Sequence, residues 1–174
     1  QWTLVQNAAP TGGWVRIGMR ILKMMCPNDA NAKWPLPRDF GSTATLPELN
    51  SPDHRLLTDF IYTPEHKSPS GTSFTGYTNY SPYSLNRFND YATDGNGDEF
   101  LFTKVESDLI YAEALLNTGK TNEAVTLINV TREGRGHLKD ITPASAAEEI
   151  IKALYYERFI ECGFPYPATS FYDR

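Results

Sequence analysis

The uneven distribution of proline constrains this chain more than any other feature of its sequence. Nine of the twelve prolines, and all three tryptophans, lie in residues 1–100. Proline fixes its own φ angle and lacks a backbone donor, and Gly, Ser, Asn and Thr interrupt this half every few residues. We therefore predict long loops with a few short strands for residues 1–100.

One segment of this first half is more regular. Residues 14–25 read WVRIGMRILKMM, and their apolar positions fit either a strand or a short helix. We favour a helix from Trp14 to Met25, ended by Pro27, because proline cannot continue a helix.

Residues 101–174 hold only three prolines, and their helix signals are clear. Thr103 and Glu106 have the spacing of a capping box, in which each side chain accepts from a backbone N–H of the other residue. Gly119 is expected to end that helix, because a helix often stops at a residue with positive φ.

Two further helices are predicted in this half. Thr121 is expected to cap the second, and Thr142 followed by Pro143 is expected to begin the third. Apolar and paired charged residues recur at helical spacing. The residues predicted on the inner faces of the first two helices are Val105, Leu109, Ala112, Leu116, Ala124, Val125 and Ile128. In the third helix, Ile150 or Ile151, Leu154, Arg158 and Glu161 follow.

Composition excludes several classes of protein. The 174 residues are 40% apolar and 21% charged, which suits one domain or a piece of a longer protein. A net charge of −5 argues against a nucleic-acid partner. No apolar run approaches the roughly 20 residues that span a bilayer. The opening QWTLVQNAAP is not a signal peptide, and because it lacks an initiator Met, a signal upstream of Gln1 stays open.

The two cysteines, Cys26 and Cys162, lie far apart and outside any CxxC pair. They could form one disulfide or remain two buried thiols, and we favour the thiols.

No motif for metal, cofactor or catalytic chemistry is found. The three histidines are scattered, so a zinc site is not expected. Asp94, Asn96 and Asp98 match the first ligands of a calcium loop, but Glu99 replaces the required glycine and Val105 the required glutamate. We read this stretch as a solvated acidic turn and predict no catalytic residues, no metal and no cofactor.

Asn129, Val130 and Thr131 match the N-glycosylation pattern. They lie inside a predicted helix, so we treat the match as chance.

The segment from Phe74 to Tyr91 carries an aromatic residue about every three positions among Gly, Ser, Thr, Asn and Pro. Aromatic rings can stack on the C–H face of a pyranose while neighbouring polar groups bind its hydroxyls. Trp34, before Pro35, suits the same role. The predicted ligand-binding residues are Trp34, Tyr77, Tyr80, Tyr83 and Arg87. The alternative is that these rings are buried and anchor the long loop.

Residues 115–129, LLNTGKTNEAVTLIN, are similar to the turn of a tetratricopeptide repeat. Gly119 lies in the turn, and the small Ala112 and Ala124 stand where the helices would cross. One such helix pair cannot bury its own apolar face, so the similarity implies neighbouring helices.

The second half as a whole resembles the C-terminal part of the SusD-like (RagB/SusD) family. The AEAL of the family corresponds to residues 112–115, and its EA…LIN segment with an arginine-containing tail corresponds to Glu123–Arg132. A later helix carries Glu157, Arg158 and Glu161. The chain departs from the usual EL..EG.R continuation, because it reads IECGFPYPATSFYDR there.

The resemblance implies a mainly α fold of tetratricopeptide-like helical hairpins with long irregular loops and a few short strands. Residues 1–100 would be the loop-rich, aromatic-rich portion and residues 101–174 the helical portion. Together they would form one domain, or a fragment of a longer one, since family members are substantially longer.

The resemblance also implies a function. The chain would belong to a non-catalytic lipoprotein on the outer-membrane surface of Bacteroidetes-type bacteria, anchored through a cysteine upstream of Gln1. It would bind an oligosaccharide or other nutrient and deliver it to a SusC-like TonB-dependent transporter. The motif residues Glu157 and Arg158 are expected to fix helix packing, because a buried arginine needs a carboxylate partner.

Two other functions stay open. One is a tetratricopeptide-like scaffold that binds proteins and has no small ligand. The other is an enzyme, such as a glycosidase, with two carboxylates distant in sequence.

Overall fold

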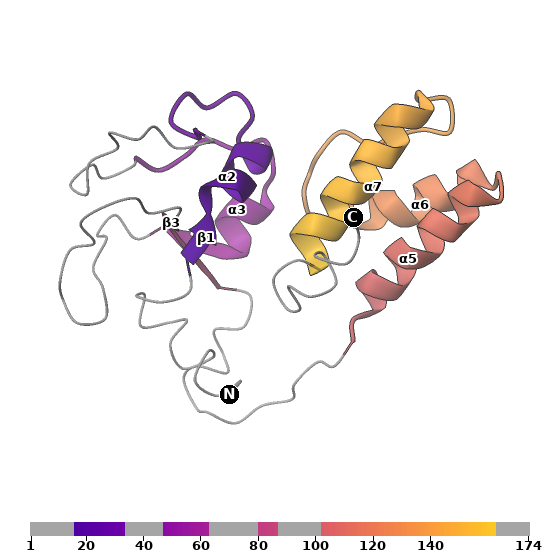
Figure 1. Cartoon of the computed structure of the whole chain (residues 1–174), viewed down its shortest axis with the longest axis horizontal. Coiled ribbons are helices and arrows are strands. Elements are labelled where there is room, and N and C mark those ends of the chain that lie inside the picture. Colours follow the sequence, from indigo (N-terminus) through magenta and orange to yellow (C-terminus); the bar gives the residue numbers. More distant parts are fainter. Residues whose placement is uncertain (1–15, 34–46, 63–79, 87–101, 163–174) are drawn as a thin grey trace. The chain divides into compact units, whose positions relative to one another are not determined.

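The computed structural model describes residues 16–33, 47–62, 80–86 and 102–162. They belong to two compact units, Gln1–Asp98 and Glu99–Arg174 (Figure 1). We call them the sheet unit and the helical unit. The described residues are mainly helical with a few short strands, as predicted.

The described part of the sheet unit combines short strands and short helices. Its strands are β1 (Arg16–Gly18), β2 (Phe60–Tyr62) and β3 (Tyr80–Leu85), and its helices are α2 (Met19–Met25) and α3 (Arg55–Thr58). The strand order is β1-β3-β2, and both neighbouring pairs are antiparallel. The central strand is therefore the last of the three in sequence.

The pairing of β1 with β3 is irregular. Arg16 lies opposite Ser84, whereas Gly18 lies opposite Tyr80. Two steps along β1 (18 − 16 = 2) thus span four steps along β3 (84 − 80 = 4). Pro82 lies within this stretch, and a proline has no N–H to donate to a strand pair. The irregularity accommodates the proline in the central strand.

Helix α2 begins later than predicted. The expected helix from Trp14 is helical only from Met19, because Arg16–Gly18 pair with β3 instead. That partner lies more than sixty positions along the chain (80 − 18 = 62), so the local pattern does not contain it. The predicted end is confirmed, since α2 stops at Met25 and Pro27 follows.

The helical unit contains the helices α5 (Lys104–Asn117), α6 (Thr121–Arg132) and α7 (Ala147–Cys162). Thr103 is the N-cap of α5 as predicted, and its Oγ1 accepts from the N–H of Glu106 at 3.2 Å. The prediction for Thr121 is wrong, because the N-cap of α6 is Lys120 and makes no side-chain cap bond.

The turn between α5 and α6 follows from a few backbone bonds. Gly119 has a φ of 77°, and its N–H donates to Leu116. The N–H of Lys120 donates to the carbonyl of Leu115 at 2.9 Å. These two bonds form the Schellman arrangement that ends many helices, which confirms Gly119 as the stop.

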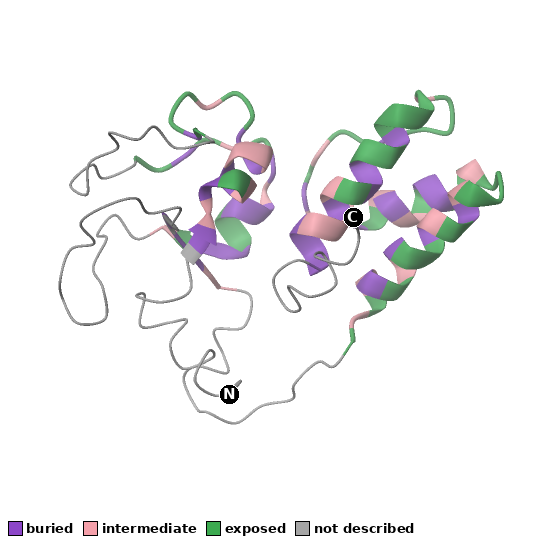
Figure 2. Cartoon of the chain, viewed as in Figure 1, coloured by how far each residue is buried: buried purple, intermediate pink, exposed green. Residues whose placement is uncertain are grey.

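Most of the predicted inner-face residues of the three helices meet in one core, whose inner surfaces are shown as buried in Figure 2. On α5 the core residue is Leu115 rather than the predicted Leu116, and Val105 and Leu116 are only partly buried against the core. Ala112 and Ala124 are fully buried, so small side chains lie inside the bundle as predicted. Ile150 is buried at 3% exposure whereas Ile151 is 44% exposed, which settles the choice between them. The core consists of Leu109, Ala112, Leu115, Ala124, Val125, Ile128, Ile141, Ile150, Ala153, Leu154 and Cys162.

Helix α7 begins at Ala147 rather than at the predicted Thr142. Thr142 and Ser145 form a separate turn, in which the Ser145 N–H donates to the Thr142 carbonyl at 2.9 Å and the Ser145 hydroxyl accepts from the Thr142 N–H. These local bonds satisfy the polar groups that a helix start would otherwise use. The connection before α7, residues 133–146, is therefore long.

None of the helices in the described ranges combines the length and the apolar character that a membrane crossing requires.

Candidate functional site

The predicted ligand-binding residues fall mostly in parts of the chain without a structural description. Trp34, Tyr77 and Arg87 lie outside the described residues. Tyr80 begins β3, but its side chain is not described. Tyr83 is fully described, so it alone reports on the two alternatives considered for the aromatic segment.

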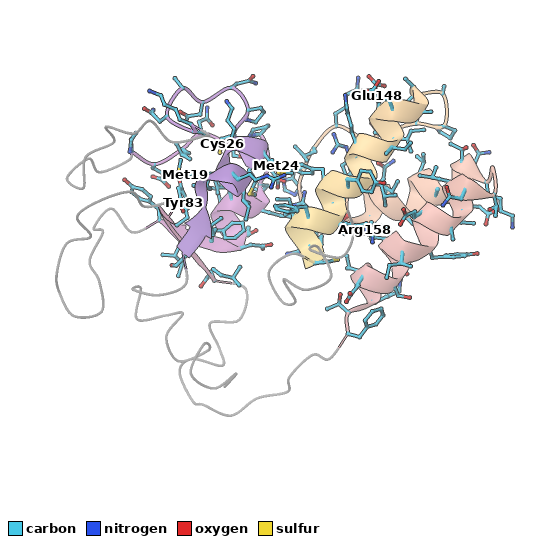
Figure 3. The ribbon with its side chains drawn as sticks, viewed as in Figure 1. Met19, Met24, Cys26, Tyr83, Glu148 and Arg158 are labelled. Carbon is cyan, nitrogen blue, oxygen red and sulfur yellow. The ribbon has the colours of Figure 1, made fainter. Side chains whose placement is uncertain are left out.

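Tyr83 is an anchor inside the sheet unit. Its exposed fraction is 2%, and its hydroxyl accepts a hydrogen bond from the backbone N–H of Leu49 at 2.7 Å. Its ring lies 5.4 Å from that of Tyr62 at an interplanar angle of 52°. Figure 3 shows the Tyr83 side chain within the sheet unit. The ring thus ties residues 47–51 to the central strand.

The prediction of Tyr83 as a sugar-stacking ring is therefore wrong. A ring at 2% exposure presents no face to a ligand. Burial also raises the pKa of Tyr83 to about 12, because the ionised phenolate would lose its hydration. At this position the anchoring alternative holds. The tyrosine body packs in the core, and its polar tip satisfies a buried backbone donor.

A buried ion pair lies a few residues after Leu49 in sequence. Asp53 is 1% exposed and Arg55 is 0% exposed. The Arg55 Nε donates to Asp53 Oδ1 at 2.9 Å, and Nη2 donates to Oδ2 at 2.8 Å. The Arg55 backbone N–H also donates to Oδ1, at 3.0 Å. This two-pronged geometry fixes the start of α3 and satisfies a charge that would otherwise be costly to bury.

The two cysteines are free and buried, as predicted. Cys26 follows α2 and is 0% exposed. Burial raises the pKa of its thiol to about 11, although a hydrogen bond with Ser51 acts in the opposite direction. A thiol that stays protonated and inaccessible is a poor nucleophile, so this site is structural.

In the helical unit, charged residues of α5, α6 and the turn after α6 form ion pairs with α7. Arg158 of α7 binds Glu113 of α5 through Nη1 and Oε2. Arg132, the last residue of α6, lies 3.6 Å from Glu157 of α7. Arg135 binds Glu161, one turn further along α7. We call these three contacts the interhelical ion-pair cluster.

The cluster is largely buried on the α7 side. The side chains of Glu157 and Glu161 are 0% and 3% exposed, and that of Arg158 is 12% exposed. Arginine keeps its charge at any physiological pH, so each of these carboxylates faces a permanent positive charge. The geometry suits helix packing, as predicted for Glu157 and Arg158.

Within the described ranges, no three His, Cys, Asp or Glu side chains gather closely enough to hold a metal ion. The acidic stretch from Asp94 to Asp98 lies outside the described residues.

Asn129, the first residue of the glycosylation-like pattern, binds the backbone of the connection that follows α6. Its Nδ2 donates to the Ile141 carbonyl at 2.8 Å, and its Oδ1 accepts from the Ile141 N–H at 3.1 Å. Thr131 of the same pattern is only 2% exposed. The side chain of Asn129 is therefore occupied as a contact between α6 and the connection that follows it.

Sequence reasoning missed three residues that hold the helical unit together. Asn129 was set aside as a chance motif, and neither Arg132 nor Arg135 was expected to pair with α7. The available signal was the cluster of arginines just after α6, opposite a helix with several glutamates. Spacing could not assign partners, because Arg135 and Glu161 are 26 positions apart.

Comparison with protein-family models, with curated proteins and with solved structures found no match to this chain.

Proposed function

We propose that this chain is part of a SusD-like protein that binds a glycan or another nutrient at the outer-membrane surface. It would deliver the nutrient to a SusC-like TonB-dependent transporter and catalyse no reaction. Its helical unit would be the tetratricopeptide-like scaffold of that protein, with α5 and α6 as one helical hairpin. A lipid anchor would lie upstream of Gln1.

One observation carries this proposal. The residues on which the resemblance rests are distant in sequence, yet Glu113, Glu157 and Arg158 take part in ion pairs between helices. Glu161 pairs with Arg135, just after α6. The AEAL helix and the later helix with Glu157 and Arg158 are thus joined by the motif residues themselves. Shared architecture is what a family motif of this kind would preserve.

The ligand site of the proposal lies in the loop-rich half. With Tyr83 buried, the remaining candidates are Trp34, Tyr77, Tyr80 and Arg87. The interhelical ion-pair cluster of the helical unit is not a candidate ligand-binding site, because each of its carboxylates already faces an arginine.

The test is a glycan array on the full chain, followed by calorimetry with each glycan that binds. Trp34→Ala and Tyr80→Ala are expected to weaken binding at least about tenfold, since a stacked base or sugar ring on an aromatic contributes on the order of 1–3 kcal/mol. Tyr111→Ala is the matched control. It removes a 54% exposed tyrosine from the helical unit and should leave binding unchanged.

Glycan binding that survives both loop substitutions would refute the residue assignment. The absence of binding to any glycan, peptide or other nutrient would refute nutrient capture.

A second function is favoured by a separate observation. Among the exposed large apolar side chains of the helical unit, four lie on α5 and α7, with exposed fractions of 44–54%. They are Ile110 and Tyr111 on α5, and Ile151 and Tyr155 on α7. A tetratricopeptide-like scaffold would use such side chains to contact a protein. In that case Ile151→Ser with Tyr155→Ser would abolish the capture of a partner protein, whereas Trp34→Ala would not.

A further inference from the structure

The connection between α6 and α7 doubles back along α6. The N–H of Gly136 donates to the Thr131 carbonyl at 2.9 Å, and the N–H of Leu138 donates to the Arg132 carbonyl at 3.0 Å. His137 between them has a φ of 51°, a conformation that reverses the chain. Ile141 then lies beside Asn129, so the chain has returned toward the middle of α6.

This path sets the direction of α7. Arg132 contacts Glu157 and Arg135 contacts Glu161, so the two ion pairs advance together along both segments. Helix α7 therefore runs in the same general direction as α6, as the ribbons in Figure 1 also show. We call residues 137–146, which make this return possible, the strap.

Two side chains of α6 hold the strap. Asn129 binds both backbone polar groups of Ile141, the N–H and the carbonyl. One turn further, the Nε of Arg132 donates to the Lys139 carbonyl at 2.8 Å. These two side chains thus bind the strap to α6, in addition to the Leu138 backbone bond to Arg132 and the burial of Ile141 in the core.

Arg132 also faces α7. Its Nη1 lies 3.6 Å from Oε1 of Glu157, whose side chain is 0% exposed. One guanidinium therefore spans the strap carbonyl and a buried carboxylate of α7. A guanidinium is a rigid planar group, so its orientation toward one partner constrains its orientation toward the other.

We propose that the strap and the C-terminal half of α7 form one conformational device, in which Arg132 couples release of the strap to loosening of α7. When the hydrogen bonds between Asn129 and Ile141 break, the strap moves away from α6 and the hydrogen bond from Arg132 to the Lys139 carbonyl breaks as well. The guanidinium then loses the contact that orients it toward Glu157. The ion pair weakens, and this half of α7 opens more often. This inference does not depend on the proposed function.

Amide hydrogen exchange on the full chain tests the coupling, because it measures local opening segment by segment. Asn129→Ala removes both bonds to Ile141. It is expected to speed exchange in the strap, and by on the order of tenfold in residues 154–162, while α5 is unchanged. Thr126→Ala is the matched control on α6, since the Thr126 hydroxyl bonds only within its own helix, to Asn122. It should change neither segment.

Arg132→Lys provides the decisive background. Lysine keeps a positive charge for Glu157 but lacks the planar fork that spans both partners. In that background Asn129→Ala should still speed exchange in the strap, yet add little in residues 154–162. An equal increase in both backgrounds would overturn the role of Arg132. Faster exchange in the strap with no change in α7 would overturn the coupling itself.

If Asn129→Ala speeds exchange throughout α5, α6 and α7, the comparison is repeated with Asn129→Asp. This variant keeps an acceptor for the Ile141 N–H and replaces the amide that donates to the Ile141 carbonyl with a carboxylate oxygen, which accepts rather than donates. Faster exchange in residues 154–162 that depends on Arg132 then supports the coupling. No change there, while exchange in the strap speeds up, shows that the strap opens independently of α7.

Discussion

Tyr83 and Cys26 are two side chains whose chemistry is changed by burial. Both have ordinary reactive groups in sequence, a phenol and a thiol, and both lie in the sheet unit with almost no exposure. In each case the ionised form is disfavoured, and the pKa is raised to about 12 for Tyr83 and about 11 for Cys26. At the scale of the residue, burial turns candidate functional groups into core residues.

The Tyr83 hydroxyl is expected to stabilise the sheet unit measurably. Tyr83→Phe keeps the ring and leaves the Leu49 N–H without its acceptor, so the free energy of unfolding should fall by about 1–3 kcal/mol. Urea denaturation measures it. Tyr111→Phe changes a 54% exposed hydroxyl and should stay within about 0.5 kcal/mol. Equal effects of the two substitutions would contradict the anchoring role.

The Cys26 thiol is expected to make stability depend on alkaline pH. Its pKa rises from 9.0 unfolded to about 11 folded, so the unfolded state ionises first. The thiol's contribution is complete below about pH 9 and is lost as pH rises through about 11. The stability difference between wild type and Cys26→Ala should therefore shrink between these values, by roughly 2–3 kcal/mol at most. A constant difference from pH 8 to pH 11 would show that the thiol is not buried.

At the scale of the secondary-structure element, the sequence predicts some helix ends correctly and others wrongly. Gly119 ends α5 as expected, because a positive φ and two backbone bonds are strictly local requirements. Thr103 caps α5, but Thr121 does not cap α6, although both threonines precede apolar helical patterns. The Schellman bonds at Gly119 and Lys120 bring the chain directly into α6, so Thr121 is already helical.

This difference gives a matched pair of substitutions. Thr103→Ala removes the acceptor of the Glu106 N–H and should destabilise the helical unit by about 1 kcal/mol. Thr121→Ala removes no cap bond and places a better helix former at the first helical position, so it should cost nothing or stabilise slightly. The helical circular dichroism signal during thermal unfolding measures both. A larger loss for Thr121→Ala than for Thr103→Ala would contradict the assigned caps.

At the scale of the whole molecule, the three helices are joined by contacts between distant segments. The apolar core supplies most of the burial, and the interhelical ion-pair cluster fixes how α7 sits on the other two helices. A buried ion pair contributes modestly when intact but is costly to break, because one charge is left without its partner. The cluster therefore specifies the arrangement more than it adds stability.

Glu157→Gln tests this point. It leaves Arg132 facing a neutral amide, and the free energy of unfolding should fall by about 3 kcal/mol. We take the lower end of the usual range because the Arg132 side chain is 21% exposed. Glu148→Gln breaks an exposed pair with Lys152, whose side chains are 78% and 72% exposed, and should stay within about 0.5 kcal/mol. Figure 3 labels Glu148 on the same helix. Urea unfolding followed by the helical signal compares the two, and similar losses would refute the contrast.

The sequence predicted the candidate site only in part. That Arg158 needs a carboxylate follows from its permanent charge, but its partner Glu113 lies 45 positions away. The choice of Tyr83 failed because the same alternation of aromatic and polar residues suits an exposed platform and a buried anchor. The hydrogen bond from the Leu49 N–H to the Tyr83 hydroxyl, which only the folded structure shows, identifies Tyr83 as a buried anchor.

By itself, the sequence determined what depends on neighbours along the chain: a mainly helical second half, the stops at Gly119 and Met25, and the apolar faces of α5 and α6. The tertiary structure alone decided the strand at Arg16–Gly18 and the partners of each arginine. These depend on segments that meet only after the chain has folded, and a local pattern carries no record of them.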